Sequence, residues 1–468
     1  MNFIKYLSLF FLSIGINITA FTQNTNVTYK LPPFEKTVLK NGLTIYLMEQ
    51  HEVPMIDISV VIPAGAIYDN KQSGLANMTA TSLMFGTKKM TKSQIEEELD
   101  FAGASVSTSA SKESAGLYAS FASKDQNKVL NIIHDILLTP TFEKKEFEKG
   151  KLLLLAQLEQ ATESPRNVIN NFFDQLTYGS HVYANPVDGR PSAVTKLTAA
   201  DALTFYKSHY LPNASAIAVV GDFKTSEMKR TLDSLFTSWQ KGTILTNEAN
   251  NPVQVLSATK VLLVNKGDAK ETTFMIGGKG VPRSNPDFVA MEVVNTVFGG
   301  RFTSWLNEEL RVNTGLTYGA RSGFSRLKNA GTFQISTFTA TKNTEAAIDK
   351  TLEVLNTLHT TGIDEKTLTS AKNYVKGGFP PRYETSGQLA GLLTQMFWYG
   401  FNESFINNFE KNVDELTVSK AKEIVTKYYP KNNLQFVLIG KASDIKKIAS
   451  KYGTVKEVSI KDENVSSF

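Results

Sequence analysis

The chain has no cysteine among its 468 residues and only five histidines. The absence of cysteine excludes disulfide bonds, thiolate metal sites and cysteine nucleophiles. The histidines, none with a second histidine close enough in sequence to share one helix face, are His51, His134, His181, His209 and His359. Because no histidine has a partner placed to complete a metal site, each is expected to pack or to face solvent.

Several other signals of function are missing. Net charge is only +5, from 50 basic and 45 acidic residues, and no basic run is interleaved with aromatic residues. This charge is too weak and too scattered for nucleic-acid binding, so no nucleic-acid partner is expected. The sequence also lacks the G-x-S-x-G elbow of serine hydrolases and the G-x-x-x-x-G-K-[ST] phosphate loop.

The first twenty residues are typical of a secretory signal peptide. They carry one charge, Lys5, followed by an apolar run from Tyr6 to Ile16 and small residues that end at Ala20. The run is too short and too broken to span a bilayer, and a mitochondrial presequence would be rich in arginine, whereas the first arginine is Arg166. We therefore expect residues 1–20 to be removed and the mature chain, which has no further apolar stretch of that kind, to be exported without a transmembrane segment.

The remaining sequence divides into two halves with the same order of predicted elements. In the first half, strands are predicted at 43–48, 56–62, 104–110, 116–121 and 214–220, and helices at 74–85, 92–101, 127–138, 144–162, 166–176 and 198–210. In the second half, strands are predicted at 260–264, 272–276, 316–324, 331–338 and 434–438, and helices at 285–297, 302–311, 345–360, 365–376, 386–399 and 418–427.

Two passages show that this repetition is an internal duplication. ALTFYKSHYLPNASAIAVVGDF at 202–223 and AKEIVTKYYPKNNLQFVLIGKA at 421–442 both run helix, tyrosine, proline, asparagine, strand and glycine. A period of about 220 residues is too long for a solenoid and fits two homologous α+β domains. We expect domains at 30–240 and 260–455, joined by a polar linker at 241–259.

One predicted helix has the form of a zinc-peptidase helix without its ligands. Residues 74–87 read GLANMTATSLMFGT, and Asn77 and Thr81 lie at i and i+4 on one face. In the H-x-x-E-H pattern of inverted zincins, these two positions hold the histidine ligands, and the glutamate base precedes the second. Here the base position is Ala80. An amide, a methyl group and a hydroxyl group are not normal zinc ligands or bases.

A second informative passage lies at 298–320, FGGRFTSWLNEELRVNTGLTYGA. A predicted helix ends near Arg311, Gly315 breaks it, and a strand is expected from Leu316. Such a corner can bring Arg311 and Tyr318 to one side. Arginine can hold a carbonyl or carboxylate group with two donors, and tyrosine can donate to an oxygen that becomes negative. From these residues alone, a surface arginine and a half-buried strand tyrosine are the simpler interpretation.

The chain resembles the pitrilysin/insulinase-type zinc peptidases, which include the mitochondrial processing peptidase group. The resemblance rests on LKNGLTIYL at 39–47, the helix at 74–87, PNASAIAVVGDF at 212–223, and FGGRFTSWLNEELRVNTGLTYG at 298–319. It covers about residues 30–455 and implies the family's half-clamshell, in which two homologous α+β domains each have helices packed on an antiparallel-rich sheet.

The resemblance also carries the family's site onto this chain. The histidine ligands fall on Asn77 and Thr81, the base on Ala80 and the glutamate ligand on Gln157, while a supporting glutamate falls on Gly150. Every metal position is therefore replaced, so no cofactor is expected in this chain. The family's substrate-binding arginine and tyrosine, in contrast, are retained as Arg311 and Tyr318.

In paired members of the family, one subunit keeps H-x-x-E-H and its partner keeps the arginine–tyrosine pair. The resemblance thus implies a non-catalytic, substrate-binding subunit of an exported heterodimeric zinc metallopeptidase in the bacterial periplasm. The chain would be inactive alone, and zinc would lie on an H-x-x-E-H-bearing partner that degrades peptides with it. The alternative is a stand-alone peptide-binding or structural scaffold protein with a peptidase-like fold.

Overall fold

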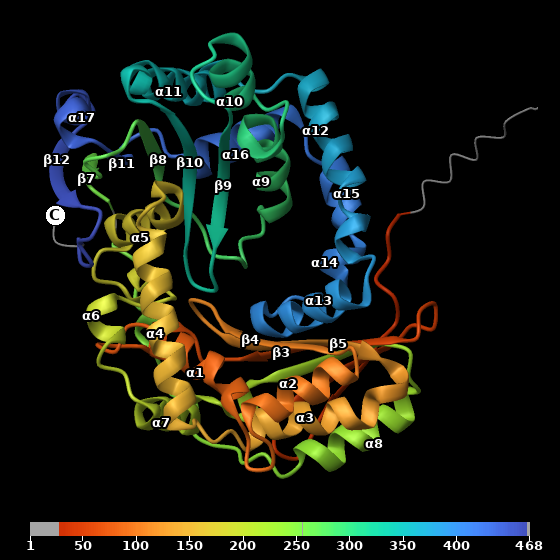
Figure 1. The fold of residues 1–468 in the computed structure, drawn as a ribbon. Helices are drawn as coiled ribbons and strands as arrows, with labels where there is room; N and C mark the ends of the chain where they lie inside the picture. The colour runs from red at the N-terminus through yellow and green to blue at the C-terminus, as the bar shows by residue number, and fades with distance from the viewer. Residues whose placement is uncertain (1–27, 255, 466–468) are drawn as a thin grey trace, which may run out of the picture.

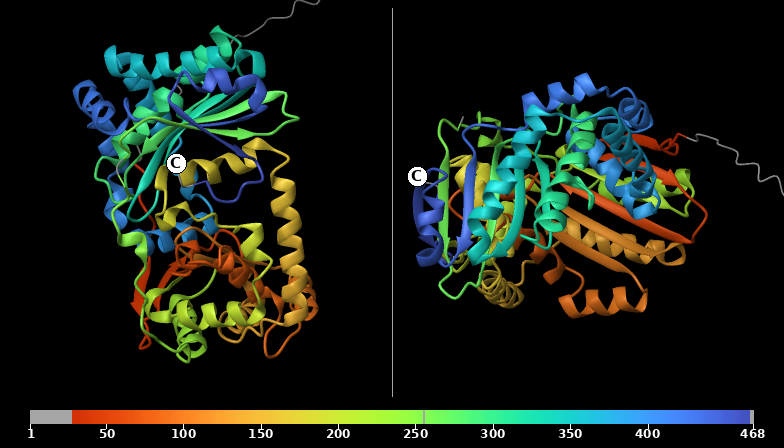
Figure 2. Two further views of the ribbon diagram at one scale, coloured as in Figure 1. Left: turned by 90° about the vertical axis from the view of Figure 1, so that its left-hand side faces the viewer. Right: turned by 90° about the horizontal axis from the view of Figure 1, so that it is seen from above.

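The computed structural model describes residues 28–254 and 256–465, which form two six-stranded sheets with helices packed on both (Figures 1 and 2). The predicted signal peptide lies outside the described residues. The first sheet contains β1 (Glu35–Val38), β2 (Thr44–Glu49), β3 (Met55–Ile62), β4 (Ser105–Ala110), β5 (Ala115–Ala122) and β6 (Ala216–Gly221). The second sheet contains β7 (Lys260–Asn265), β8 (Glu271–Lys279), β9 (Ala320–Arg326), β10 (Gly331–Ala340), β11 (Gln435–Gly440) and β12 (Thr454–Ser459).

The two sheets repeat one topology. The first has the order β1-β2-β6-β3-β5-β4 and the second β12-β7-β11-β8-β10-β9. Five consecutive strands therefore correspond one to one, and in each sheet one central pair is parallel, β2 with β6 and β7 with β11. Only the sixth strand differs, because β1 comes from the start of the chain and pairs antiparallel, whereas β12 comes from its end and pairs parallel. The predicted fold class, two homologous α+β domains, is confirmed.

The helices follow the order expected from the sequence, with additions. Those of the first half are α1 (Leu75–Ser82), α2 (Lys92–Phe101), α3 (Gln126–Leu138), α4 (Lys144–Ala161), α5 (Pro165–Tyr178), α6 (Pro191–Val194), α7 (Ala199–His209) and α8 (Thr225–Phe236). Those of the second half are α9 (Phe288–Asn295), α10 (Trp305–Asn307), α11 (Thr344–Thr360), α12 (Glu365–Gly377), α13 (Ser386–Tyr399), α14 (Glu403–Asn407), α15 (Phe409–Asp414), α16 (Val418–Tyr428) and α17 (Ala442–Ala449). Within the described part of the chain, none of them is long and apolar enough to span a bilayer.

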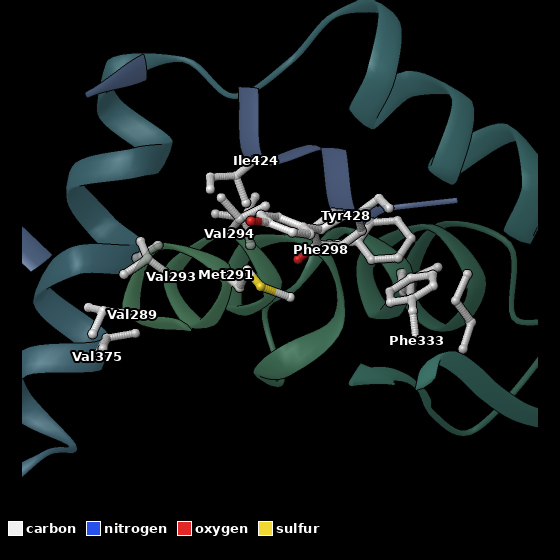
Figure 3. Close-up of a cluster of buried hydrophobic side chains, with 14 of the residues drawn as sticks. Val289, Met291, Val293, Val294, Phe298, Phe333, Val375, Ile424 and Tyr428 are labelled. Atoms are coloured by element: carbon white, nitrogen blue, oxygen red, sulfur yellow. The ribbon is translucent and has the colours of Figure 1, made fainter. Parts of the chain in front are cut away.

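Each sheet has its own helices on one face, which we call the outer face. In the first domain α2, α3 and α8 cover it, as Figure 1 shows. In the second domain α9 packs between the sheet and helices α12 and α16, and a continuous core results (Figure 3). Phe298 and Phe333 join this core from the end of the α9 segment and from β10. Burial of such side chains contributes about 1.5–3 kcal/mol each.

The opposite, inner faces are covered by exchanged helices. Helix α5 of the first half packs on β8 and β11 of the second sheet, where Phe172 and Phe173 meet Met275 and Val437. Helix α13 of the second half packs on β3 and β6 of the first sheet, where Thr394 shares a 2.8 Å hydrogen bond with Ser59. Helix α5 leaves part of the β9–β10 hairpin accessible on the inner face. The exchange fixes the two halves against each other.

A second junction joins the tips of the two equivalent hairpins. Glu113, in the β4–β5 turn, is only 4% exposed. Its carboxylate accepts hydrogen bonds from the Tyr183 hydroxyl at 2.6 Å and from the backbone N–H of Lys328, in the β9–β10 turn, at 2.9 Å. A buried charge needs such donors because burial removes its hydration.

Replacement of Glu113 by glutamine should therefore destabilise the protein. The amide keeps the shape but turns one acceptor into a donor that faces other donors, so a loss of about 1–3 kcal/mol in unfolding free energy is expected. Chemical denaturation of the mature chain measures this loss. Glu97→Gln, at an exposed position of α2, is the matched control and should change stability little. Equal stability of the Glu113 variant and wild type would show that the hydrogen bonds of Glu113 do not stabilise the contact between the two hairpin tips.

Candidate functional site

Helix α1 is fixed by a buried carboxylate six residues before its first residue. Asp69 accepts hydrogen bonds from the backbone N–H of Gly74 at 2.7 Å and of Ala76 at 2.8 Å, so it satisfies donors of the first turn. Burial, opposed by these hydrogen bonds and by the charge of Arg190, raises the pKa of Asp69 to about 7. Gly74 has φ +94°, and a Cβ there would lie 3.1 Å from Gly189 Cα, so the loop that contains Asp188 can approach the helix.

Three of the predicted metal positions line one pocket. Asn77 and Thr81 reach it from α1 and Gln157 from α4, and the pocket has a volume of about 450 Å³. Asn77 and Thr81 therefore share one face of α1, as their i, i+4 spacing predicts, and this face lies toward α4. Ala80 does not line the pocket and is completely buried in the core behind α1. A glutamate side chain at position 80 has no space without rearrangement of that core.

The donor groups of this pocket do not suit zinc. The Asn77 amide donates a long hydrogen bond of 3.4 Å to Asp188, while the Thr81 hydroxyl and the Gln157 amide are exposed. Zinc sites in proteins use thiolate, imidazole and carboxylate ligands. Among residues 28–254 and 256–465, no group of three or more histidine and acidic side chains is arranged to hold a metal ion.

The position of the supporting glutamate is also closed. A Cβ at Gly150 would lie 2.6 Å from Cζ of Phe85, closer than real side chains approach. The aromatic ring thus occupies the space in which an acidic side chain would start. The residues present do not fit zinc, both because of their chemistry and because of the packing around them.

The second motif differs from its predicted secondary structure. The helix expected at 302–311 is a short α10 followed by a π-helical segment, Glu308–Asn313, which contains Arg311. Strand β9 begins at Ala320 and not at Leu316, so Tyr318 lies in an irregular segment before the strand. The start predicted for this strand is wrong, because residues 316–319 follow the C-terminal turn instead of pairing with β10. π-Helical turns often occur at functional sites.

Arg311 and Tyr318 are both exposed and have separate aromatic neighbours. The Arg311 guanidinium lies 4.7 Å from the centre of the Phe302 ring. Tyr318 is 81% exposed, and its ring is stacked 6.5 Å from that of Phe338. No hydrogen bond joins the arginine and the tyrosine in the described structure. Both polar groups are therefore free to bind a ligand, and the alternative of a half-buried strand tyrosine is wrong.

Sequence reasoning missed the residues around Tyr318. A pocket of about 480 Å³ brings Tyr318 together with Arg166 of α5 and Arg321 of β9. Arg321 lies three residues after Tyr318, so the sequence motif could have been extended to include it. Arg166 precedes it by about 150 residues in the sequence, and only the crossing of α5 onto the second sheet brings the two together.

The histidines pack or face solvent, as expected. His51 is exposed and hydrogen-bonds Asp222 at 2.8 Å and Glu49 at 3.4 Å; these bonds raise its pKa. His209 is packed between aromatic rings, and burial lowers its pKa to about 4. Neither histidine lines the pocket between α1 and α4.

Comparison with known families gives two matches along the chain. Residues 44–189 match the family described as Insulinase (Peptidase family M16). Residues 196–375 match the one described as Peptidase M16 inactive domain. The first match contains the α1–α4 pocket, and the second contains Arg311, Tyr318 and Arg321.

Some curated relatives are named as peptidases, and one is named as a non-peptidase homolog. The chain is 26% identical to an uncharacterized zinc protease of Rickettsia felis, over 73% of this chain and 82% of the relative. It is 22% identical to a protein of Helicobacter pylori named non-peptidase homolog YmxG, over 84% and 90%. It is 20% identical to a probable mitochondrial-processing peptidase subunit beta of Arabidopsis thaliana, over 88% and 80%.

A solved structure supports the fold. The peptidase M16 inactive domain structure from Pseudomonas fluorescens aligns with a TM-score of 0.81 at 24% identity, and the alignment covers 87% of this chain and 98% of that one. A likeness at this identity establishes the arrangement of the two domains and not the activity.

Restoring ligands should restore zinc binding at the α1–α4 pocket. In the variant Asn77→His, Thr81→His, Gln157→Glu, two imidazoles and one carboxylate converge in one pocket, so about one zinc per chain is expected by metal analysis. Ala80 stays unchanged because it is buried. The wild type should hold no stoichiometric zinc, and the control without Gln157→Glu should bind more weakly. Zinc in the wild type, or none in the triple variant, would contradict the assignment of these positions.

Asp69 should make stability depend on pH. Its pKa is raised when folded, so its contribution is greatest below the unfolded value of about 3.9 and is lost as pH rises through about 7. Unfolding free energy should therefore fall between about pH 4 and 8, and the fall should be smaller in Asp69→Asn. Denaturation across this range tests it; an identical pH profile for both proteins would exclude Asp69 as the source.

Proposed function

Because this chain belongs to the insulinase-type M16 peptidase family, we propose that it is the non-catalytic, substrate-binding subunit of a heterodimeric zinc peptidase that degrades peptides. One observation carries the proposal. The pocket between α1 and α4 offers an amide, a hydroxyl and a second amide where the family has its ligands, while Arg311 and Tyr318 stay exposed. A chain that has lost its metal chemistry but keeps groups for holding a peptide is suited to binding and not to cleavage.

The second motif exposes several large apolar and aromatic side chains to solvent. Phe302 is 65%, Val312 61% and Tyr318 81% exposed, and all three lie within 17 residues of sequence that include Arg311. Exposed aromatic and aliphatic side chains that gather beside a charged group are typical of interaction sites. This surface supports contact with a peptide or with a second subunit.

In this proposal the two motif residues hold and polarise the peptide. The Arg311 guanidinium donates two parallel hydrogen bonds to a carbonyl or carboxylate group, which fixes the peptide in position. The Tyr318 hydroxyl donates to the carbonyl oxygen that gains negative charge during attack. Such positioning accounts for a large share of the rate of many enzymes, so a subunit without metal can be required for cleavage.

The partner is a homologous subunit that carries H-x-x-E-H. Its zinc supplies the Lewis acid and the activated water that this chain lacks. The relative named as a processing peptidase subunit supports a role for this chain as one subunit of a complex. With residues 1–20 as a signal peptide, the complex would be exported, and we place it in the bacterial periplasm.

Loss of the motif should reduce cleavage by the complex. With the H-x-x-E-H partner present, Tyr318→Phe should lower kcat about 10²-fold, because a donor to the developing oxyanion is lost. Arg311→Ala should mainly raise KM. Cleavage of a fluorogenic peptide measures both.

Arg230→Ala, at an exposed position of α8 far from the motif, is the control and should leave both constants unchanged. Full activity of both motif variants would favour the scaffold alternative, in which the chain supports an assembly without touching the substrate. No stimulation of the partner by wild-type chain would refute the proposed function itself.

A further inference from the structure

The pocket beside Tyr318 has a chemical character of its own. It lies on the inner face of the second sheet, beside α5, where parts of β9 and β10 are not covered by that helix. Its lining includes Arg166, Arg321, Tyr318, Asn170, Ser336 and Phe338. We call it the arginine pocket. Two cationic side chains, three polar ones and an aromatic floor make it different from the apolar contacts under α5.

Arg321 reaches the pocket through the sheet register. It is paired with Ser336 of β10, which is paired in turn with Met275 of β8, so the three side chains point to the same face. Met275 is covered by α5, whereas Arg321 on the outermost strand is exposed. In the described residues, no carboxylate lies within ion-pair distance of Arg321. Its five N–H donors are available to a ligand.

Arg166 approaches from the other side. It is the second residue of α5, and its guanidinium lies 3.6 Å from the centre of the Phe338 ring, so a cation–π contact holds it over the pocket floor. One of its nitrogens lies 3.7 Å from Glu271, but both side chains of that pair are more than half exposed. Such an exposed pair contributes little to stability, so Arg166 can exchange Glu271 for a ligand at low cost.

Positive charge exceeds negative charge at this pocket, because Glu271 pairs with Arg166 alone and Arg321 has no acidic partner among the described residues. None of the residues that line it is acidic. In the α1–α4 pocket, by contrast, Lys149 is paired with Glu146 at 2.7 Å, and Asp188 adds a further negative charge. An excess of cations in a concave site, next to a tyrosine donor and an apolar floor, selects an anion that carries an apolar stem.

We propose that the arginine pocket binds a carboxylate of the peptide substrate, either an acidic side chain or the C-terminal carboxylate. This proposal rests on the proposed function, because it names the substrate class of the same binding subunit. Arg321 and Arg166 clamp the carboxylate, Tyr318 and Ser336 complete its hydrogen bonds, and Phe338 contacts the aliphatic stem.

The position of the pocket fits an extended peptide. Ala161 lines the α1–α4 pocket and Arg166 lines the arginine pocket, so five residues separate the two sites along the chain. The Cα atoms of Ala161 and Arg166 are therefore at most about 18 Å apart. A peptide of about six extended residues spans that distance. The carboxylate can thus serve as an anchor for a longer segment.

Direct binding to the purified mature chain tests the proposal without the partner. Three fluorescent peptides of one length are compared by anisotropy: one with an internal glutamate and an amidated C-terminus, one with glutamine in its place, and one without acidic residues but with a free C-terminal carboxylate. At least one carboxylate peptide should bind about tenfold or more tightly than the amidated glutamine peptide. The arm that shows the preference identifies the source of the carboxylate.

The preference should disappear in Arg321→Glu and shrink in Arg321→Gln and Arg166→Gln. Arg230→Glu, which makes the same charge change on α8, should keep it. Because Arg321 is exposed and makes no ion pair, its variants should fold normally. Equal binding of all three peptides by wild type, or a preference that survives Arg321→Glu, overturns the proposal.

Failure of the proposed function gives a different result. If peptides bind with the expected preference but the chain never stimulates an H-x-x-E-H partner, the carboxylate site stands and the role in a peptidase falls. If the chain stimulates the partner while no peptide prefers a carboxylate, the subunit role stands and the arginine pocket falls. If no peptide binds and no stimulation occurs, both fall.

Discussion

Each sheet in this protein has two faces to cover, and a helix from the other half covers part of the second face. Helix α5 buries Phe172 and Phe173 against the second sheet, and α13 buries its apolar side against the first. Neither half can move away without exposing the inner face of a sheet. Because an α-helix is narrower than a six-stranded sheet, α5 also leaves part of the β9–β10 hairpin accessible, and the arginine pocket lies there.

The same exchange explains how distant parts of the sequence form the candidate sites. Helix α4 leaves the first domain, turns at residues 162–164 and continues as α5 on the second sheet (Figure 2). The first of these helices contributes Gln157 to the degenerate metal pocket, and the second contributes Arg166 to the arginine pocket. One corner of the chain therefore positions both sites, and the buried hydrogen bonds of Glu113 fix the hairpin tips at a separate point.

Local patterns in the sequence predicted most of the fold. The hairpin of β4 and β5 follows from alternation, and the duplicated order of elements follows from the paired passages that end at β6 and β11. Strands β1 and β12 were not predicted, because short strands at the edge of a sheet carry charged residues and little apolar pattern. The π-helical turn at Arg311 was not predictable either, since α- and π-helical turns draw on the same residue types.

For the site, the sequence predicted which residues share a helix face but not what surrounds them. The i, i+4 spacing of Asn77 and Thr81 holds in the structure, whereas the burial of Ala80 and the ring of Phe85 over Gly150 depend on tertiary packing. These contacts distinguish the three ligand positions from the other two. The ligand positions Asn77, Thr81 and Gln157 still line an open pocket of about 450 Å³. At the positions of the base and of the supporting carboxylate, Ala80 is buried in the core and the Phe85 ring lies where a Cβ on Gly150 would be, so an acidic side chain at either position requires rearrangement. The exposed Arg311 and Tyr318, in contrast, contribute little to the core, and the apolar surface exposed beside them is a cost in free energy that a bound partner or peptide would offset.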